Sequence, residues 1–436
     1  MDTKRDTFFN ESLATQKVAV IGAGIVGVNC ALALQLLGYQ VTLIDKQGIG
    51  EGCSKGNAGH FAAEQVFPLA EPALLMQLPK MLLDPLGPIA LSPTHFIKAT
   101  PWFMQFFNNM RGKKREKNTV AIKALNKHAI DYYKPLLAQA NAEHLLVCKG
   151  SLLVFEKTAF TEVKAMHKHY QQAGIKVELL TREQVLALEP NLHDNISYAL
   201  YFTDVAHSGN PWEICLALTD YAKRLGMVFK QLAVDNIVQD ETGVVIKGEN
   251  ESLHFNHCVV ATGAWSKSLL KDLGYCLPIE AERGYSLSVN IGEHASPLLS
   301  RPVASAERKF IITPMDKMVR LSGTVEYAGL NAKANYQRAE MLLKNAGFIL
   351  KEMPVEVEKK SVKKEIEKQW MGPRPSLPDS LPVICRAPEH DKVFFALGHQ
   401  HLGLTQGAIT GKLIGQLVSG QKTDIDVSPL CISRFN

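Results

Sequence analysis

KVAVIGAGIVGVNCALALQLLGYQVTLID, at residues 17–45, is the stretch that predicts the core of the fold. Its opening run, 17–21, is largely apolar and β-branched, which indicates a strand buried on both faces of a parallel sheet. Gly22, Gly24 and Gly27 follow with the spacing G-x-G-x-x-G. In this pattern the first glycine permits a tight turn, the second lets the backbone approach a pyrophosphate, and the third lets helix and strand pack closely.

A helix is expected at 25–37, directly after the glycines. Its first residues, Ile25 and Val26, would point backbone N–H groups and the positive end of the helix dipole at a phosphate. A second strand, 40–44, leads to Asp45, which lies where an acid can accept hydrogen bonds from an adenosine ribose. These features predict a dinucleotide site, and they leave NAD and FAD as alternatives.

Composition limits the classes of protein to consider. The chain has 436 residues, which suggests two or three domains. The formal net charge is +5 and the basic residues are spread along the sequence, so no nucleic-acid partner is expected. The first 16 residues lack the apolar core of a signal peptide, which predicts a cytoplasmic protein. The 8 cysteines form no C-x-x-C pair, so free thiols are expected, and no metal site.

One segment carries the only membrane signal. Residues 67–107 contain many Leu, Met, Pro and Phe residues, and a basic run follows at 111–117. We expect short helices over a ligand site and then a solvated basic turn. The alternative is peripheral attachment to an anionic surface at the inner face of a membrane. No apolar run has the length that a membrane-spanning helix needs.

Glycine-rich junctions recur after two later strand patterns. A strand at 258–261 is expected to end at Thr262-Gly-Ala-Trp265, where Ser266 could cap a short helix. A strand at 392–397 ends at Gly398 and continues through a turn into a helix that ends near residue 418. Glycine at the carboxyl end of a buried strand suits a ligand crevice, and a helix N-terminus there attracts an electron-rich group.

The remaining patterns complete the predicted α/β fold. Residues 278–290, 309–314 and 318–324 alternate as antiparallel strands do, 121–141 is helical, and 359–368 is a charged helix or turn. A Rossmann-like nucleotide-binding domain would then be assembled from three discontinuous segments, with an α+β substrate domain on a mostly antiparallel sheet inserted between them. The expected boundaries are 1–66, 205–272 and 372–436 for the first domain, and 67–204 and 273–371 for the second.

The sequence resembles the FAD-dependent amino acid oxidases and dehydrogenases, which include glycine oxidase, sarcosine oxidase and the bacterial D-amino acid dehydrogenases. Seven motifs carry this resemblance, in family order over nearly the whole chain: VIGAGIVG with Asp45, CSKGNAGH, VVATGAWS, ERGYSLS, GTVE, GPRPSLPDSLPVI and GHQHLGLTQG. The D-amino acid dehydrogenases look most similar, through ERGYSLS and GPRPSLPDSLPVI.

The resemblance implies where FAD binds. The glycine turn would hold its pyrophosphate, Val234 would meet the adenine, residues 54–59 would run beneath the flavin, and residues 403–405 would place backbone donors at the flavin's pyrimidine carbonyl. Negative charge develops at that edge on reduction, and a helix N-terminus stabilises it. The full set is Gly22, Gly24, Ile25, Val26, Gly27, Asp45, Lys46, Ser54, Asn57, Ala58, Gly59, Val234, Gly263, Trp265, Gly398, Gly403, Leu404 and Thr405.

Arg374 is the residue expected to bind the substrate. A planar guanidinium grips a carboxylate with two parallel hydrogen bonds and so fixes the α-carbon over the flavin. The alternative is a surface arginine in a proline-rich turn. Tyr285 could hold the carboxylate or amine, or be a half-buried strand tyrosine. His60, His207 and one of His399 and His401, with His401 preferred, are candidates for contact with flavin or substrate, against a structural role.

At two positions the sequence differs from members of the family, and these differences bear on the substrate pocket and on how the flavin is held. Glycine oxidase-like relatives carry a substrate-binding tyrosine on the strand that here is residues 310–314, FIITP, so the polar contacts of the pocket must differ. Monomeric sarcosine oxidases attach the flavin through a cysteine where this chain has Gly372, so noncovalent FAD is expected.

The resemblance implies oxidation of the C–N bond of a small amino or imino acid to an imine. Among possible substrates, D-amino acids rank first, and D-proline or cis-4-hydroxy-D-proline rank second. Electrons would pass to a quinone, another carrier or oxygen. The alternatives are a glycine- or sarcosine-type oxidase, an NAD-dependent dehydrogenase, and a flavin-binding protein without catalysis.

Overall fold

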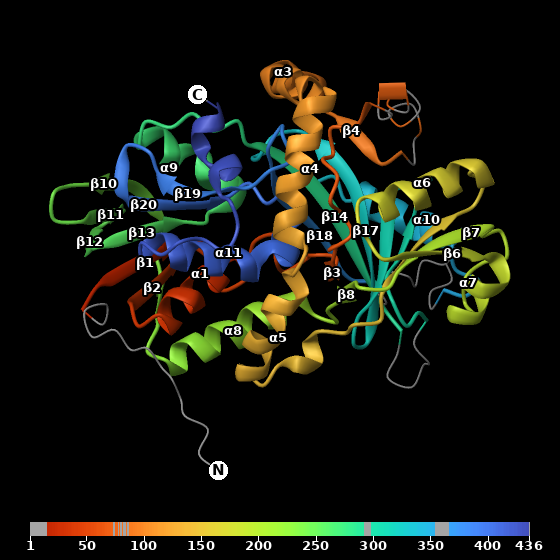
Figure 1. The fold of residues 1–436 in the computed structure, drawn as a ribbon, viewed down its shortest axis with the longest axis horizontal. Helices are drawn as coiled ribbons and strands as arrows, with labels where there is room; N and C mark the ends of the chain where they lie inside the picture. The colour runs from red at the N-terminus through yellow and green to blue at the C-terminus, as the bar shows by residue number, and fades with distance from the viewer. Residues whose placement is uncertain are drawn as a thin grey trace, which may run out of the picture.

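The computed structural model describes residues 15–435 except 73–74, 77, 79–80, 82–83, 85–86, 292–297 and 354–365, and it describes only the backbone of 366–368. Two large sheets, of six and nine strands, lie side by side, and α4 (Gly112–Asn126) runs along their boundary (Figure 1). The predicted α/β class with a mixed second sheet is confirmed.

The six-stranded sheet contains the strand at residues 17–21 near its centre. Its order is β19-β20-β13-β1-β2-β9. All neighbours pair in parallel except β19 and β20. The strands are β1 (Lys17–Ile21), β2 (Gln40–Asp45), β9 (Val228–Gln231), β13 (His257–Val260), β19 (Val383–Ala387) and β20 (His390–Leu397). Segments far apart in the sequence therefore build one Rossmann-like sheet.

Two helices cross closely over one face of this sheet, α1 (Ile25–Leu36) and α11 (Gly403–Val418) (Figure 1). Glycine makes the crossing possible, because a Cβ at Gly411 would lie 2.4 Å from the carbonyl oxygen of Asn29. A Cβ at Gly407 would lie 3.0 Å from the side-chain amide of Asn29 on α1 and 2.5 Å from the hydroxyl of Tyr133, which comes from a third helix. The close crossing brings the N-termini of both helices to the same edge of the sheet.

The nine-stranded sheet is mostly antiparallel, as predicted. Its order is β18-β14-β17-β16-β15-β5-β7-β6, with β4 paired to β17; only the pairs β15–β5 and β17–β4 are parallel. The strands are β18 (Ile366–Ser376), β14 (Glu280–Asn290), β17 (Met318–Tyr327), β16 (Phe310–Pro314), β15 (Val303–Ser305), β5 (Ser151–Phe155), β7 (Tyr198–Phe202), β6 (Val177–Thr181) and β4 (Ile89–Leu91).

Smaller elements complete the described chain. A two-stranded sheet joins β3 (His60–Phe61) to β8 (Ala206–His207), and a three-stranded one contains β10 (Val234–Gln239), β11 (Val244–Gly248) and β12 (Glu251–Phe255). The other helices are α3 (Pro93–Asn108), α5 (Ala129–Gln139), α6 (Phe160–Gln172), α7 (Arg182–Leu188), α8 (Pro211–Arg224), α9 (Ser266–Asp272) and α10 (Gln337–Ala346), with 3-10 turns at Glu143–Leu145, Gly263–Trp265, Ser428–Leu430 and Ile432–Phe435.

Three predictions about helices were wrong. The basic run 111–117 is not a turn, because α4 begins at Gly112 and its lysines and arginines are good helix formers. The single helix expected at 121–141 is divided between α4 and α5. Ser266 does not cap α9 but is its first residue, and its hydroxyl donates to the carbonyl of Gly263.

The two remaining differences concern β18. The charged stretch at 359–368 lies outside the described residues up to residue 365, and its end is the start of this strand. Arg374 also lies in β18, not in a proline-rich turn. Pro373 and Pro375 are tolerated because β18 is the last strand of its sheet, where a missing N–H costs no ladder hydrogen bond on the open side.

Candidate active site

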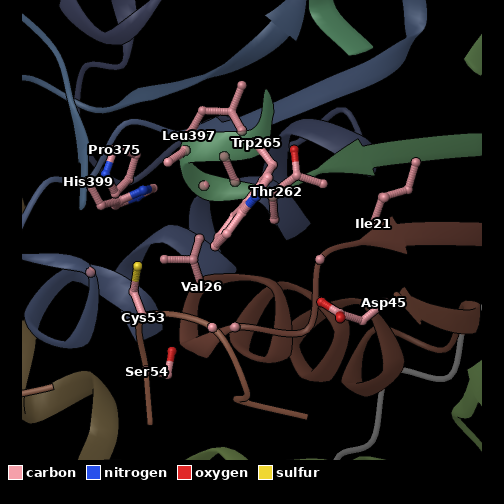
Figure 2. A pocket seen from close by; sticks show the side chains of 18 of the residues that line it. Ile21, Val26, Asp45, Cys53, Ser54, Thr262, Trp265, Pro375, Leu397 and His399 are labelled. Atoms are coloured by element: carbon pink, nitrogen blue, oxygen red, sulfur yellow. The ribbon is translucent and has the colours of Figure 1, made fainter. Parts of the chain in front are cut away.

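A cavity of about 630 Å³ lies at the carboxyl ends of the parallel strands (Figure 2). Asp45 stands at one end and His399 and Pro375 at the other, with Trp265 between them. Its wall contains these predicted cofactor residues: Gly22, Gly24, Ile25, Val26, Asp45, Lys46, Ser54, Asn57, Val234, Gly263, Trp265, Gly398, Gly403 and Leu404. Gly27, Ala58, Gly59 and Thr405 do not line the wall.

The glycine turn between β1 and α1 has the geometry that its spacing predicts. Gly22 has φ of 104°, and a Cβ there would lie 2.4 Å from the carbonyl oxygen of Ala261 on the adjacent segment. A Cβ at Gly27 would lie only 1.8 Å from the carbonyl oxygen of Gly22. A Cβ at Gly24 would meet only the Ser54 hydroxyl, at 3.5 Å, so this glycine leaves space for a ligand rather than for the protein.

Side chains from two other segments hold this turn in place. The Asp45 carboxylate accepts a hydrogen bond from the backbone N–H of Ala23 at 2.8 Å. The Ser54 hydroxyl accepts one from the N–H of Ile25 at 2.9 Å. At the same end of the cavity, the Lys46 ammonium lies 4.8 Å from the centroid of a ring of Trp265. The acid at the end of β2 therefore orders the phosphate turn and still faces the cavity.

The N-terminus of α11 forms the opposite end. Gly398 has φ of 74°, and a Cβ there would lie 2.2 Å from a methyl group of Leu377. Thr405 is buried, and its hydroxyl accepts a hydrogen bond from the N–H of Ala62 at 2.9 Å. His399 is also buried and hydrogen-bonds through Nε2 to the hydroxyl of Thr410 at 3.0 Å. Thr405 and His399 are thus structural supports for this turn.

Arg374 lies on the face of the nine-stranded sheet that carries Glu282. The two residues are paired across β18 and β14, and Nη1 of Arg374 donates to Glu282 at 2.9 Å. A Cβ at Gly284 would lie 2.3 Å from Nη2 of the arginine, so bare backbone makes room for the guanidinium. Glu282 is 4% exposed. The guanidinium is therefore held in one orientation against the sheet.

The same sheet face contacts the loop of residues 53–59. The Trp370 ring covers Gly56, where a Cβ would lie 2.0 Å from it. Nη1 of Arg320 donates to the carbonyl oxygen of Asn57 at 2.8 Å, and its Nε donates to Ser288 at 3.2 Å. Burial lowers the pKa of Arg320 to about 10. Asn57 lines the cavity, so Arg374 shares a sheet face with the residues that meet the predicted cofactor loop.

Arg320 was not among the predicted site residues. The available signal was its place between two apolar strand residues, Val319 and Leu321, where it shares the face of Ser288. Alternation alone marks such a residue as facing away from the core, and only the structure shows that the cofactor loop covers that face.

Tyr285 lies on the opposite face of β14 from Arg374. Its hydroxyl donates to Glu326 at 2.5 Å and accepts a hydrogen bond from the N–H of Asn335 at 2.9 Å. Arg283, which is fully buried, points to the same side. Successive side chains of a strand point to opposite faces, so the position of Tyr285 argues against the predicted contact with the substrate.

His60 and His207 form a cross-strand pair between β3 and β8. Nε2 of His60 lies 3.6 Å from Glu64, and both side chains are at most 10% exposed. Burial, followed by the charges of His207 and His401, lowers the pKa of His60 to about 3. Burial raises the pKa of Glu64 to about 8. These groups form an uncharged polar cluster at neutral pH.

His401 connects this cluster to the arginine. Its Nε2 hydrogen-bonds to the amide oxygen of Gln65 at 2.5 Å. Burial lowers its pKa to about 4, while the charge of Glu282 raises that pKa and the charge of Arg374 lowers it. His401 is therefore the predicted histidine on which the charges of both Glu282 and Arg374 act.

Four histidines that are buried or nearly so predict a steep loss of stability in mild acid. The pKa is about 3 for His60 and His399 and about 4 for His207 and His401, mainly because of burial. Their unfolded forms take up protons below about pH 6.5, so the free energy of unfolding falls as the pH falls. Glu64 opposes this by one proton between about pH 4.5 and 8, since it keeps its proton when folded. Urea unfolding should therefore lose up to about 4 kcal/mol per pH unit near pH 5.

The His399→Gln variant provides the check on this prediction. Glutamine can keep the hydrogen bond to Thr410 but does not titrate. The variant should reduce the slope of stability against pH by about one proton, and the same slope in both proteins would contradict the assignment.

Comparisons with known proteins identify the family. A family model described as FAD dependent oxidoreductase matches residues 17–417. The chain is 31% identical over 422 residues to a D-amino-acid oxidase from Bradyrhizobium diazoefficiens, which covers 96% of this chain and 98% of that protein. The chain belongs to the family of FAD-dependent oxidoreductases. FAD is its cofactor, which decides between the two dinucleotides that the glycine fingerprint allows.

Solved structures share the fold of this FAD-dependent oxidoreductase. Glycine oxidase from Geobacillus kaustophilus superposes with a TM-score of 0.71 at 22% identity, over 96% of this chain and 99% of its own. L-Proline dehydrogenase from P. horikoshii gives a TM-score of 0.71 at 19% identity, over 96% and 97% of the two chains. At these identities the likeness shows the fold alone.

The cavity fits FAD in its donor set and its shape. The bare position at Gly24, the N-terminus of α1 and the Asp45 carboxylate match a pyrophosphate followed by a ribose. The second helix N-terminus, at Gly403, lies beside His399, whose Cβ would be 3.7 Å from a Cβ at Gly403, and the electron-rich ring edge would come there. Asp45 and Trp265 would thus hold the adenosine half, and Asn57 and Leu404 the flavin half.

Proposed function

We propose that this FAD-dependent oxidoreductase oxidises the C–N bond of a small amino or imino acid. D-Amino acids rank first, and D-proline or cis-4-hydroxy-D-proline rank second. The observation that carries the proposal is Arg374, oriented by Glu282 on the sheet face that contacts the cofactor loop. The amino or imino acids named for the D-amino-acid oxidase and the L-proline dehydrogenase agree with this substrate class.

The residues of the chain bind and orient the substrate. Arg374 would take the carboxylate through its second edge while Nη1 stays on Glu282. Trp102, Phe103 and Tyr327 form an aromatic cluster beside β18, and the Trp102 indole donates to the carbonyl of Ser376 at 3.2 Å. Such a cover excludes water and favours the neutral amine. FAD held by these residues would supply the two-electron oxidant for the C–N bond, and water would hydrolyse the resulting imine.

Two observations support noncovalent FAD. A Cβ at Gly372 would lie 1.9 Å from the Trp370 ring, so no cysteine side chain fits at that position. Cys53 lines the cavity, but burial raises its pKa to about 12, which keeps it as an unreactive thiol. We propose residues 1–66, 205–272 and 372–436 as the FAD-binding domain and 67–204 and 273–371 as the substrate domain, because strands of the six-stranded sheet come from all three of the first segments. The boundary at 372 crosses β18, whose end with Arg374 belongs to the nine-stranded sheet.

An anaerobic panel of reductants tests the proposal. The purified yellow protein would be mixed with D-amino acids, D-proline, cis-4-hydroxy-D-proline, sarcosine, glycine and the L-enantiomers. We expect bleaching of the flavin absorbance by D-amino acids or cyclic D-imino acids. Bleaching by glycine or sarcosine alone would indicate the alternative oxidase, and absence of bleaching by every compound would contradict the proposal. Reoxidation by oxygen or by a soluble quinone then identifies the acceptor class.

We also propose peripheral contact of α3 with an anionic membrane surface. Ile97 and Met104 are 74% and 67% exposed, while Trp102 and Phe106 are buried on the inner side of the same helix. A surface helix that is apolar on two sides marks an interaction site. The basic residues that begin α4 follow directly and would meet anionic lipid. No helix of the described residues is long and apolar enough to span a membrane.

Vesicle sedimentation measures this contact. Vesicles with anionic phospholipid should carry the protein into the pellet, and the double variant Ile97→Ser, Met104→Ser should reduce binding at least tenfold. Val228→Ser is the matched control, because Val228 is 57% exposed on β9. A protein that stays in the supernatant with every lipid, or that dimerises through this face in sedimentation velocity, would contradict membrane contact.

A further inference from the structure

Glu282 is a buried carboxylate to which the proposed function gives no contact with the substrate. Within the described residues its hydrogen-bond donor is Arg374, at 2.9 Å. The next carboxylate on the same face of β14, Glu280, is instead paired with His95 at 2.7 Å. Glu282 therefore lies beside the guanidinium that would bind a substrate carboxylate, whereas Glu280 is bound to a helix.

The charges of Arg374 and Glu282 limit the ligands that this site can bind. Arg374 carries one positive charge and Glu282 one negative charge. His401 and Tyr327 beside them are uncharged at neutral pH, because burial lowers the pKa of His401 to about 4 and raises that of Tyr327 well above its usual value, and the Glu280 carboxylate is paired with His95. Cys53 is likewise held as a thiol. A plain carboxylate would bring its negative charge but no donor to Glu282, whereas an amino or imino acid also brings an N–H that can donate to Glu282.

We propose that Glu282 accepts a hydrogen bond from the amino or imino N–H of the substrate. The α-amine and the carboxylate of an amino acid are attached to one carbon. Nη1 of Arg374 and Oε1 of Glu282 bond each other at 2.9 Å, which leaves the other edge of the guanidinium for the carboxylate and Oε2 of Glu282 for the amine. The pair would thus select compounds that carry both groups and reject plain carboxylic and 2-hydroxy acids. This inference rests on the proposed role of Arg374 and names the feature of the substrate that the site recognises.

Matched ligands that differ only in the amine provide the test. D-Proline and the oxygen analogue of the same configuration, tetrahydrofuran-2-carboxylate, would be titrated anaerobically against the flavin spectrum of the holoenzyme. In the unaltered protein we expect D-proline to bind at least tenfold more tightly than the oxygen analogue. Equal affinities would overturn the inference without any variant.

Glu282→Gln then separates recognition from positioning. We expect the variant to bind D-proline at least tenfold more weakly and the oxygen analogue equally or more tightly, because a lone carboxylate no longer meets the Glu282 charge. If Glu282 only positioned Arg374, both ligands would weaken alike, and the inference would be wrong. Glu280→Gln is the control, and it should change neither affinity. Failure of every amino acid to bleach the flavin of the unaltered protein would instead refute the proposed function. The binding ratios could still be measured in that case, so the two outcomes are distinguishable.

Discussion

Arg374→Ala should lower kcat/KM for the best amino acid substrate by about 10²- to 10³-fold while the protein stays yellow. The variant loses a bidentate, charge-assisted contact with the carboxylate, and it leaves Glu282 buried beside an empty space. A change of this size is about 3–4 kcal/mol, which lies within the roughly 2–5 kcal/mol that truncating one partner of a buried charged contact costs in binding. The loss should fall mainly on the apparent affinity. Steady-state kinetics and the ratio of flavin to protein measure the two effects.

The controls for this prediction use the same residue type. Arg374→Lys keeps the charge but not the planar fork, so it should recover only part of the lost affinity. Arg386→Ala removes an exposed arginine of β19 and should leave kcat/KM unchanged. Turnover of Arg374→Ala at the unaltered rate and affinity would show that Arg374 does not bind the carboxylate.

The cofactor end of the site could be predicted because its signals are local. The spacing of Gly22, Gly24 and Gly27 specifies the turn within a few consecutive residues, and the structure has that geometry, with Gly27 packed against Gly22. The second junction, at Gly398 and Gly403, was visible for the same reason. Each of these glycines meets a backbone or a cavity within a few residues of a strand end.

The substrate end could not be predicted to the same depth. Which face of a strand looks at the cofactor depends on strand register, and register is a property of two distant segments. Arg374 and Tyr285 were grouped as neighbours, but the pairing of β18 with β14 places them on opposite faces. Glu282 and Arg320 could not be identified as site residues for the same reason. The partner of Glu282 is Arg374 on the neighbouring strand, and the partner of Arg320 is Asn57 in the loop that covers the sheet.

Two errors have one physical cause. Local propensity led to a turn at 111–117 and to a proline-rich turn around Arg374. In the structure the first segment is helical because α4 packs Ile122 and Leu125 into the core, and the second is a strand because β18 needs hydrogen bonds only from β14. Tertiary packing overrides local propensity where a segment has one buried side.

Gly27→Ala should abolish most FAD binding and also destabilise the protein without FAD. The new methyl group would lie 1.8 Å from the carbonyl oxygen of Gly22, so α1 must move away from the phosphate turn. Overpacking of this kind costs about 1–3 kcal/mol, and a displaced helix N-terminus no longer points its donors at the pyrophosphate. Titration with FAD and urea unfolding of the FAD-free chain measure the two losses.

Gly24→Ala is the matched comparison, because its methyl group would meet only the Ser54 hydroxyl at 3.5 Å. The FAD-free chain should unfold at the urea concentration of the unaltered protein, while FAD affinity should fall, since the methyl group enters the cavity wall where the pyrophosphate passes. Wild-type stability in Gly27→Ala would show that α1 can relax without cost. The two Cβ distances require that Gly27 serves the packing of α1 and that Gly24 leaves space for the ligand. Equal losses of unfolding free energy in both variants would contradict this difference between the two glycines.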